Sequence, residues 1–111
     1  MEELKGKVAV VTGASRGIGK ALASTAAGLG INLSIAARQE APLKEAAEEL
    51  SKKHKVEVLA VPCDVTKLSD LENLVNKTKE RFGRIDILIN NAGVSSQYPF
   101  QEQPIEDFEK L

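Results

Sequence analysis

The chain has 111 residues, of which 42% are hydrophobic and 28% are charged, with a formal net charge of −1 at pH 7. These values are typical of one water-soluble globular domain and exclude a disordered or fibrous chain. The near-neutral charge offers no broad basic surface for a nucleic acid. No apolar run approaches the roughly 18 residues that cross a bilayer, and the first residues, MEELKGK, lack the apolar segment of a signal peptide. We therefore expect a cytoplasmic protein without a nucleic-acid or membrane partner.

The first half of the chain alternates strand and helix patterns. Residues 7–12 (KVAVVT) form a short β-branched apolar run, which predicts a strand buried on both faces. Apolar positions at helical spacing predict a helix from Gly17 until Gly30, a glycine that suits the left-handed position after a helix. A second strand is expected at 32–37 (NLSIAA). A second helix follows, with one apolar face made of Leu43, Ala46, Ala47 and Leu50.

The second half repeats this alternation. Residues 56–62 (VEVLAVP) predict a third strand. A third helix is indicated by the stripe Leu71, Leu74, Val75, Thr78 and Phe82. Thr66 or Ser69 is expected to cap this helix, since Ser69 and Glu72 fit a capping box, and Gly83 is expected to end it.

A fourth strand is expected at 86–90 (DILIN), followed by a polar loop and a helix that starts at Pro104. We expect residues 1–111 to form one domain that is truncated within this last helix. Strands that alternate with helices pair in parallel through right-handed crossovers, so the fold class is α/β. The fourth strand forms an apolar edge, which predicts poor solubility or partial unfolding of the 111 residues alone.

A glycine motif lies between the first strand and the first helix. Residues 12–19 read TGASRGIG, with the spacing Gly-x-x-x-Gly-x-Gly. Glycines allow a tight turn, a close approach of backbone amides to a pyrophosphate, and close packing of helix on sheet. The helix amino terminus adds unpaired N–H groups and a partial positive charge, which favour an anion. The alternative is an ordinary glycine-rich turn between a strand and a helix.

Three further segments accompany this motif: CDVT at 63–66, FGRID at 82–86 and NNAG at 90–93. With TGASRGIG, they resemble the signatures of the short-chain dehydrogenase/reductase family, and the resemblance covers essentially the whole chain. It implies a Rossmann doubly wound parallel sheet with strand order 3-2-1-4. It also implies hydride transfer between a nicotinamide cofactor and a small-molecule carbonyl or alcohol, in a full-length homo-oligomer. Among the reductases of this family, the sequence most resembles the 3-oxoacyl-[acyl-carrier-protein] reductases.

The resemblance assigns roles to residues of this chain. Asp64 and Val65 are expected to hold the adenine, Asn91 to line the cofactor cleft near the ribose, and Asn90 to brace neighbouring strands. The alternatives are a solvent-exposed loop carboxylate for Asp64 and a plain polar turn for the two asparagines. The expected cradle for the adenosine and pyrophosphate end consists of Gly13, Ser15, Arg16, Gly17, Ile18 and Gly19.

The residue at the end of the second strand selects between NAD and NADP, because a carboxylate there binds the ribose hydroxyls and repels a 2′-phosphate. This position is Ala37, followed by Arg38. Arg16 and Arg38 could both bind the phosphate, since a guanidinium group offers a planar fork of donors and stays ionised. NADP is therefore favoured over NAD. The alternative is that either arginine is a solvated surface residue.

The family's catalytic Tyr-x-x-x-Lys pair and its partner Ser and Asn are not found in this chain. Tyr98 is the only tyrosine, and no lysine follows four residues later. We therefore expect no catalytic residue in the 111 residues, which alone are predicted to be inactive, and an NADP-dependent enzyme in the full-length form. The alternative is a non-catalytic dinucleotide-binding sensor or scaffold.

The chain has one cysteine and one histidine, which do not make a metal site. Cys63 is expected to be a small core residue, with a reactive thiol as the alternative. His54 follows Lys52 and Lys53 in a polar stretch, which favours a solvated surface position.

Overall fold

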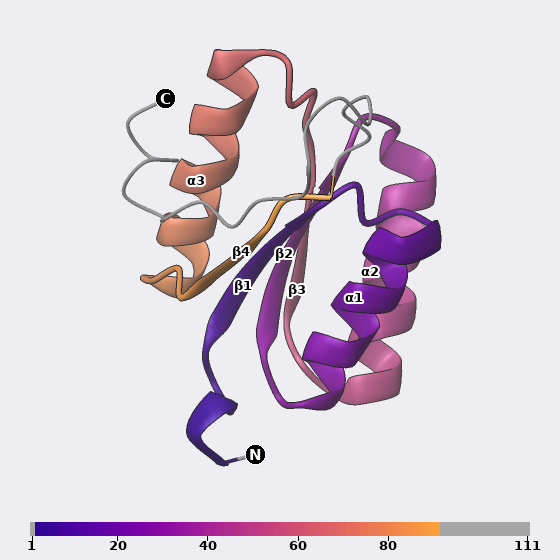
Figure 1. Cartoon of the computed structure of the whole chain (residues 1–111), viewed down its shortest axis with the longest axis vertical. Coiled ribbons are helices and arrows are strands. Elements are labelled where there is room, and N and C mark those ends of the chain that lie inside the picture. The colour runs from indigo at the N-terminus through magenta and orange to yellow at the C-terminus, as the bar shows by residue number, and fades with distance from the viewer. Residues whose placement is uncertain (1, 92–111) are drawn as a thin grey trace.

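The computed structural model describes residues 2–91, which form a four-stranded parallel sheet with helices on both faces (Figure 1). A short 3-10 helix at Glu2–Leu4 precedes the first strand. The central strand β1 (Val8–Thr12) pairs with β2 (Asn32–Ala37) and with β4 (Ile87–Ile89). Strand β2 also pairs with β3 (Val58–Pro62). The strand order β3-β2-β1-β4 confirms the expected α/β fold and its 3-2-1-4 topology.

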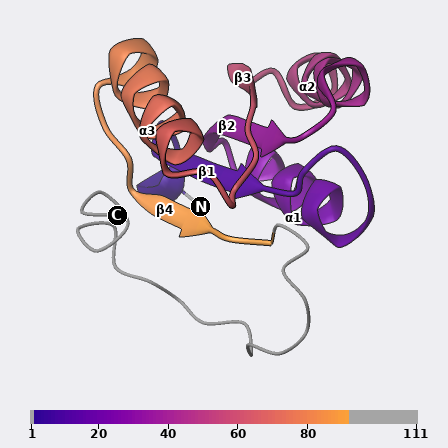
Figure 2. The same ribbon diagram turned by 90° about the horizontal axis from the view of Figure 1, so that it is seen from above.

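Two helices cover one face of the sheet and one covers the other, as the view from above shows (Figure 2). These are α1 (Gly17–Gly28) and α2 (Glu40–His54) on one face, and α3 (Leu68–Phe82) on the opposite face. Because side chains alternate along a strand, Val11 packs among the side chains of the α1 and α2 face, and Val10 packs with Leu74 of α3. All five residues of β1 are therefore buried, as its unbroken apolar run predicts.

The helix ends agree with the glycine signals, but one capping prediction is wrong. Gly30 and Gly83 follow α1 and α3 with φ of +85° and +79°. Neither Thr66 nor Ser69 caps α3, because the N-cap position is Lys67 and no side chain bonds there. The Thr66 hydroxyl instead donates to Asp64 Oδ1 at 2.6 Å, and Ser69 already lies inside the helix.

The burial predictions for Cys63 and His54 have different outcomes. Cys63 is buried, as predicted for a core residue. The surface prediction for His54 is wrong: the residue is half-buried, its Nε2 lies 3.1 Å from Ser24 Oγ, and its ring lies beside Gly28. The lysines around His54 are solvated, but the His54 side chain, in the last turn of α2, packs against α1.

Residues 92–111 lie outside the described part of the chain, and so do the expectations for Tyr98 and for a helix from Pro104 to Leu111. Within residues 2–91, no helix is both long enough and apolar enough to cross a membrane.

Candidate functional site

The glycine motif forms a tight turn that leads from the carboxyl end of β1 into α1. Gly13 and Gly17 both have a φ of +63°, a conformation that costs a residue with a side chain about 1–2 kcal/mol. Gly19 is needed for a different reason. A Cβ on this residue would lie 2.0 Å from the Gly13 carbonyl oxygen and 2.8 Å from Asn91 Nδ2. The turn therefore closes on itself, and the three glycines are required by its geometry.

The amino terminus of α1 opens from this turn with its N–H groups uncapped. Arg16 occupies the N-cap position in an extended conformation, without a side-chain cap, and the first turn of the helix contains no acidic residue. Ser15 is half-buried, while Arg16 and Gly17 are exposed. Ile18 is 72% exposed, so an apolar side chain stands in solvent beside the uncapped amides. Free N–H groups and the positive end of the helix dipole make this terminus suited to an anion.

The end of β4 is joined to the end of β1 through side chains. The buried Thr12 hydroxyl donates to Asn90 Oδ1 at 2.8 Å and accepts the backbone N–H of Asn91 at 2.9 Å. Asn90 thus braces the two strands, as expected. The Asn91 side chain lies against Gly19. The Asn91 side chain therefore packs against the glycine turn.

Arg38 and Asp64 lie close together where β2 and β3 end. The backbone N–H of Cys63 donates to the Ala37 carbonyl oxygen at 2.9 Å, which keeps the two strand ends side by side. Hydrogen bonds from the Thr66 hydroxyl and N–H lower the pKa of the half-buried Asp64, against an opposing effect of burial, and the charges of Arg38 and Lys67 lower it further. Asp64 is therefore ionised at neutral pH.

The remaining predicted residues flank these groups. Val65 is half-buried and packs against the cluster between the sheet and α3. Arg16 follows β1 and Arg38 follows β2, and these strands pair with Thr12 opposite Ala36. The two exposed arginines thus leave the same edge of the sheet from neighbouring strands.

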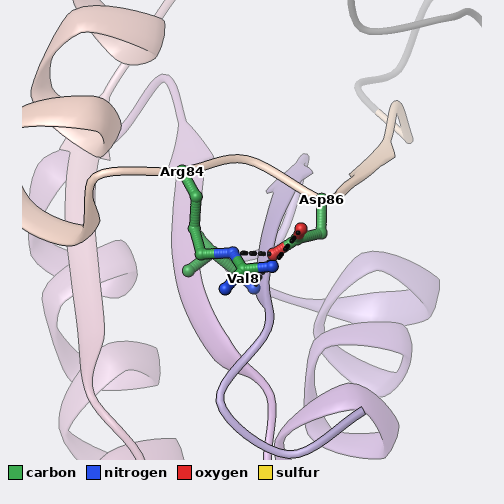
Figure 3. Close-up of polar contacts among 3 residues, drawn as sticks. All are labelled: Val8, Arg84 and Asp86. Atoms are coloured by element: carbon green, nitrogen blue, oxygen red, sulfur yellow. Dashed lines mark hydrogen bonds and ion pairs between the residues drawn. The ribbon is translucent and has the colours of Figure 1, made fainter. Parts of the chain in front are cut away.

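Asp86 forms a separate polar cluster at the opposite edge of the sheet (Figure 3). Its Oδ2 accepts hydrogen bonds from the Val8 N–H at 2.9 Å and from Arg84 Nε at 2.8 Å, and its Oδ1 accepts one from Arg84 Nη2 at 2.9 Å. Burial raises the pKa of Asp86, but the hydrogen bonds from Arg84 and Val8 and the charges of Arg84 and Lys7 outweigh it, so that the pKa is lowered. This part of the FGRID segment therefore fixes the start of β4 against β1, far from the glycine turn.

The sequence pattern assigns no role of their own to two contributors to the site, Thr12 and Asp70. Thr12 ends an apolar strand with a buried hydroxyl, which is a signal for a polar partner near that strand end. Asp70 lies in the first turn of α3, where an acidic residue is common for dipole reasons alone. Its bond to the Asp64 N–H at 2.8 Å is visible only in three dimensions. Within residues 2–91, no group of His, Cys, Asp and Glu side chains could hold a metal ion.

Comparison with known proteins agrees with this geometry. A family model described as short chain dehydrogenase matches residues 7–111. The chain belongs to the short-chain dehydrogenase family. One relative, an oxidoreductase of Staphylococcus saprophyticus, is 41% identical over 111 residues, which is 100% of this chain and 47% of that protein.

Two solved members of the short-chain dehydrogenase family share the fold. L-sorbose reductase from Gluconobacter frateurii, solved with NADPH and L-sorbose, is 40% identical with a TM-score of 0.80, and the match covers 96% of this chain and 40% of that one. A family member from Burkholderia phymatum, solved with NAD, is 36% identical with a TM-score of 0.73 and is matched over 79% of this chain and 31% of its own. The present chain thus spans less than half the length of each of these relatives.

Proposed function

We propose that the complete protein is an NADP-dependent oxidoreductase that reduces a small-molecule carbonyl or oxidises the matching alcohol. The observation that carries this proposal is the glycine turn, in which a Cβ on Gly19 would lie 2.0 Å from the Gly13 carbonyl oxygen. Such a tight turn brings backbone groups, and not side chains, close to the amino terminus of α1. Related proteins solved with NADPH or NAD support a nicotinamide dinucleotide as the ligand.

The residues of the turn fit the linked phosphates of such a cofactor. The uncapped N–H groups at the start of α1 can donate to phosphate oxygens, and no acidic residue in the first turn repels them. Ile18 offers an exposed apolar surface next to these donors. Asn91 is held against the turn, so its amide can hydrogen bond a ribose hydroxyl. Ser15 adds a half-buried hydroxyl at the same edge.

The adenosine end is assigned to the neighbouring strand ends. Asp64 carries a negative charge and can accept from the exocyclic amine of adenine, while Val65 offers an apolar contact. We place the 2′-phosphate between Arg16 and Arg38, because Ala37 provides no carboxylate that would repel it. Charge-assisted hydrogen bonds contribute about 1.5–3 kcal/mol each. Two arginines together therefore correspond to roughly a hundredfold to ten-thousandfold preference for NADP over NAD, and their exposure to solvent reduces this preference.

When bound, a nicotinamide cofactor would supply the hydride for the carbonyl carbon, and an acid of the protein would supply the proton for the carbonyl oxygen. We assign this acid to a part of the protein beyond these 111 residues, since the only tyrosine, Tyr98, has no lysine four residues later. The 111 residues alone are accordingly expected to be inactive. Their task in the whole protein, which we expect to be a homo-oligomer, is to bind and orient the cofactor.

Ala37→Asp combined with Arg38→Ala tests the cofactor assignment in the complete gene product. NADPH and NADH titrations followed by nicotinamide fluorescence should show that the preference for NADPH falls by at least tenfold. Lys53→Ala removes an exposed positive charge from the last turn of α2 and serves as the matched control. An unchanged preference in the double variant would contradict the assignment of the 2′-phosphate. Binding of NADPH without turnover of any carbonyl would favour a sensor or scaffold over an enzyme.

A further inference from the structure

The loop that carries Asp64 is held in place by several polar contacts. The Asp64 N–H donates to Asp70 Oδ2 at 2.8 Å, and the Asp64 carbonyl oxygen accepts the Lys67 N–H at 2.9 Å. The Asp64 Oδ1 atom accepts from the Thr66 N–H at 3.0 Å and from its hydroxyl at 2.6 Å. Both backbone polar groups of Asp64 and one carboxylate oxygen are therefore engaged.

The other carboxylate oxygen of Asp64 is available. Among residues 2–91, no group donates a hydrogen bond to Oδ2. A carboxylate offers about four acceptor positions on its two oxygens, so Oδ2 can still accept from a ligand. With Oδ1 fixed by Thr66, the direction in which Oδ2 faces is set by the backbone at Asp64.

The hydrogen bond that Asp70 accepts from the Asp64 N–H fixes that backbone. The carboxylate of Asp70 reaches out of α3 to the loop, while the N-cap position of its own helix, Lys67, has no side-chain cap. A carboxylate that only stabilised the helix would be expected to bond the free N–H groups of its own first turn. Helix α3 is in turn anchored on the sheet, since the buried Thr78 hydroxyl bonds the buried Ser34 hydroxyl at 2.8 Å.

We propose that Asp70 is a positioning residue for the cofactor site: by holding the Asp64 N–H, it orients the Asp64 carboxylate so that Oδ2 accepts from the adenine amine. This inference rests on the proposed function and extends it to a residue that does not touch the cofactor. Asp70 transmits the fixed position of α3 to the loop after β3. A positioning error of the order of 1 Å is known to be costly in such sites.

The test compares Asp70→Ala with Asp70→Asn in the complete gene product. The amide of Asn keeps an oxygen that can accept the Asp64 N–H, whereas Ala has none. Glu72→Ala, which removes an exposed carboxylate from the same end of α3, is the matched control. Two quantities are measured for each variant: the Kd of NADPH by fluorescence titration, and the hydrogen-exchange rate of the Asp64 amide by NMR. The second measurement needs no cofactor.

For Asp70→Ala we expect faster exchange of the Asp64 amide and an NADPH Kd about tenfold higher, the effect of losing one charge-assisted hydrogen bond. Asp70→Asn should restore both quantities to within a few-fold of the original protein, and Glu72→Ala should change neither. Faster exchange of the Asp64 amide with an unchanged Kd of NADPH overturns the positioning role. A Kd in Asp70→Asn that is as high as in Asp70→Ala also overturns it. Both outcomes leave the proposed function intact. Failure of the unaltered protein to bind either nicotinamide dinucleotide refutes the proposed function and this inference with it.

Discussion

Replacing Gly19 with alanine is the sharpest test of the glycine turn. The added methyl group would lie 2.0 Å from the Gly13 carbonyl oxygen and 2.7 Å from the Gly13 carbonyl carbon. Ordinary contacts of a Cβ begin at 3.4 Å, so the backbone at Gly13 has to move by about 1.4 Å. The carbonyl is main chain and cannot rotate away as a side chain can. We expect a loss of about 1–3 kcal/mol in the free energy of unfolding, as for other overpacked sites.

The same movement displaces the donors of the turn from the phosphates. Losing one or two charge-assisted hydrogen bonds corresponds to roughly a tenfold to ten-thousandfold weaker NADPH affinity. Fluorescence titration measures this affinity, and urea denaturation measures the stability. Gly28→Ala is the control, because a Cβ there meets only His54 ring atoms at 3.7 Å, and alanine suits the end of α1 at least as well as glycine. A Gly19→Ala protein with unchanged Kd and unchanged urea midpoint would refute this account of the turn.

The two other predictions concern residues outside the turn. Asp86→Ala leaves the buried Val8 N–H without its side-chain acceptor and should lower the free energy of unfolding, measured with urea at pH 7, by about 1–3 kcal/mol. Because the pKa of Asp86 is lowered in the folded state, this loss should persist above the ordinary value of 3.8 and vanish as the pH falls through the folded pKa. A loss of stability that is independent of pH would contradict the role of the Asp86 charge. Cys63 should resist iodoacetamide at pH 8 in the native protein and react in urea, because burial, aided by the charges of Asp70 and Asp64, raises the pKa of its thiol to about 11. Mass spectrometry measures the alkylation, and equal alkylation rates in both states would exclude a buried neutral thiol.

Most of the fold could be predicted from local patterns. The run NLSIAA, which ends before the charged Arg38, predicts the second strand at its observed bounds, Asn32–Ala37. The first and third strands begin one and two residues later than predicted, at Val8 and Val58. The parallel order followed from alternation of strands and helices, which restricts the topology strongly.

The partners of individual polar side chains were less accessible to prediction. Thr66 and Ser69 match a local capping pattern, yet the Thr66 hydroxyl serves Asp64 instead. His54 is surrounded by polar residues in the sequence, and only its packing against α1 covers it in part. Asp70 gives no sign in the sequence that it bonds a loop six residues earlier. The partners of His54 and Asp70 belong to another element, and the partner of Thr66 lies two residues earlier in the same loop.

The interlock of Thr12 with Asn90 and Asn91 has a thermodynamic consequence. Within residues 2–91, strand β4 is short and its three residues are only half-buried, so little apolar burial from this part of the chain holds it in place. Its carboxyl end is instead tied to the turn that we assign to the phosphates. A ligand that binds only the folded turn stabilises every contact on which the turn depends, by mass action. Cofactor concentration should therefore affect how firmly β4 is held against β1.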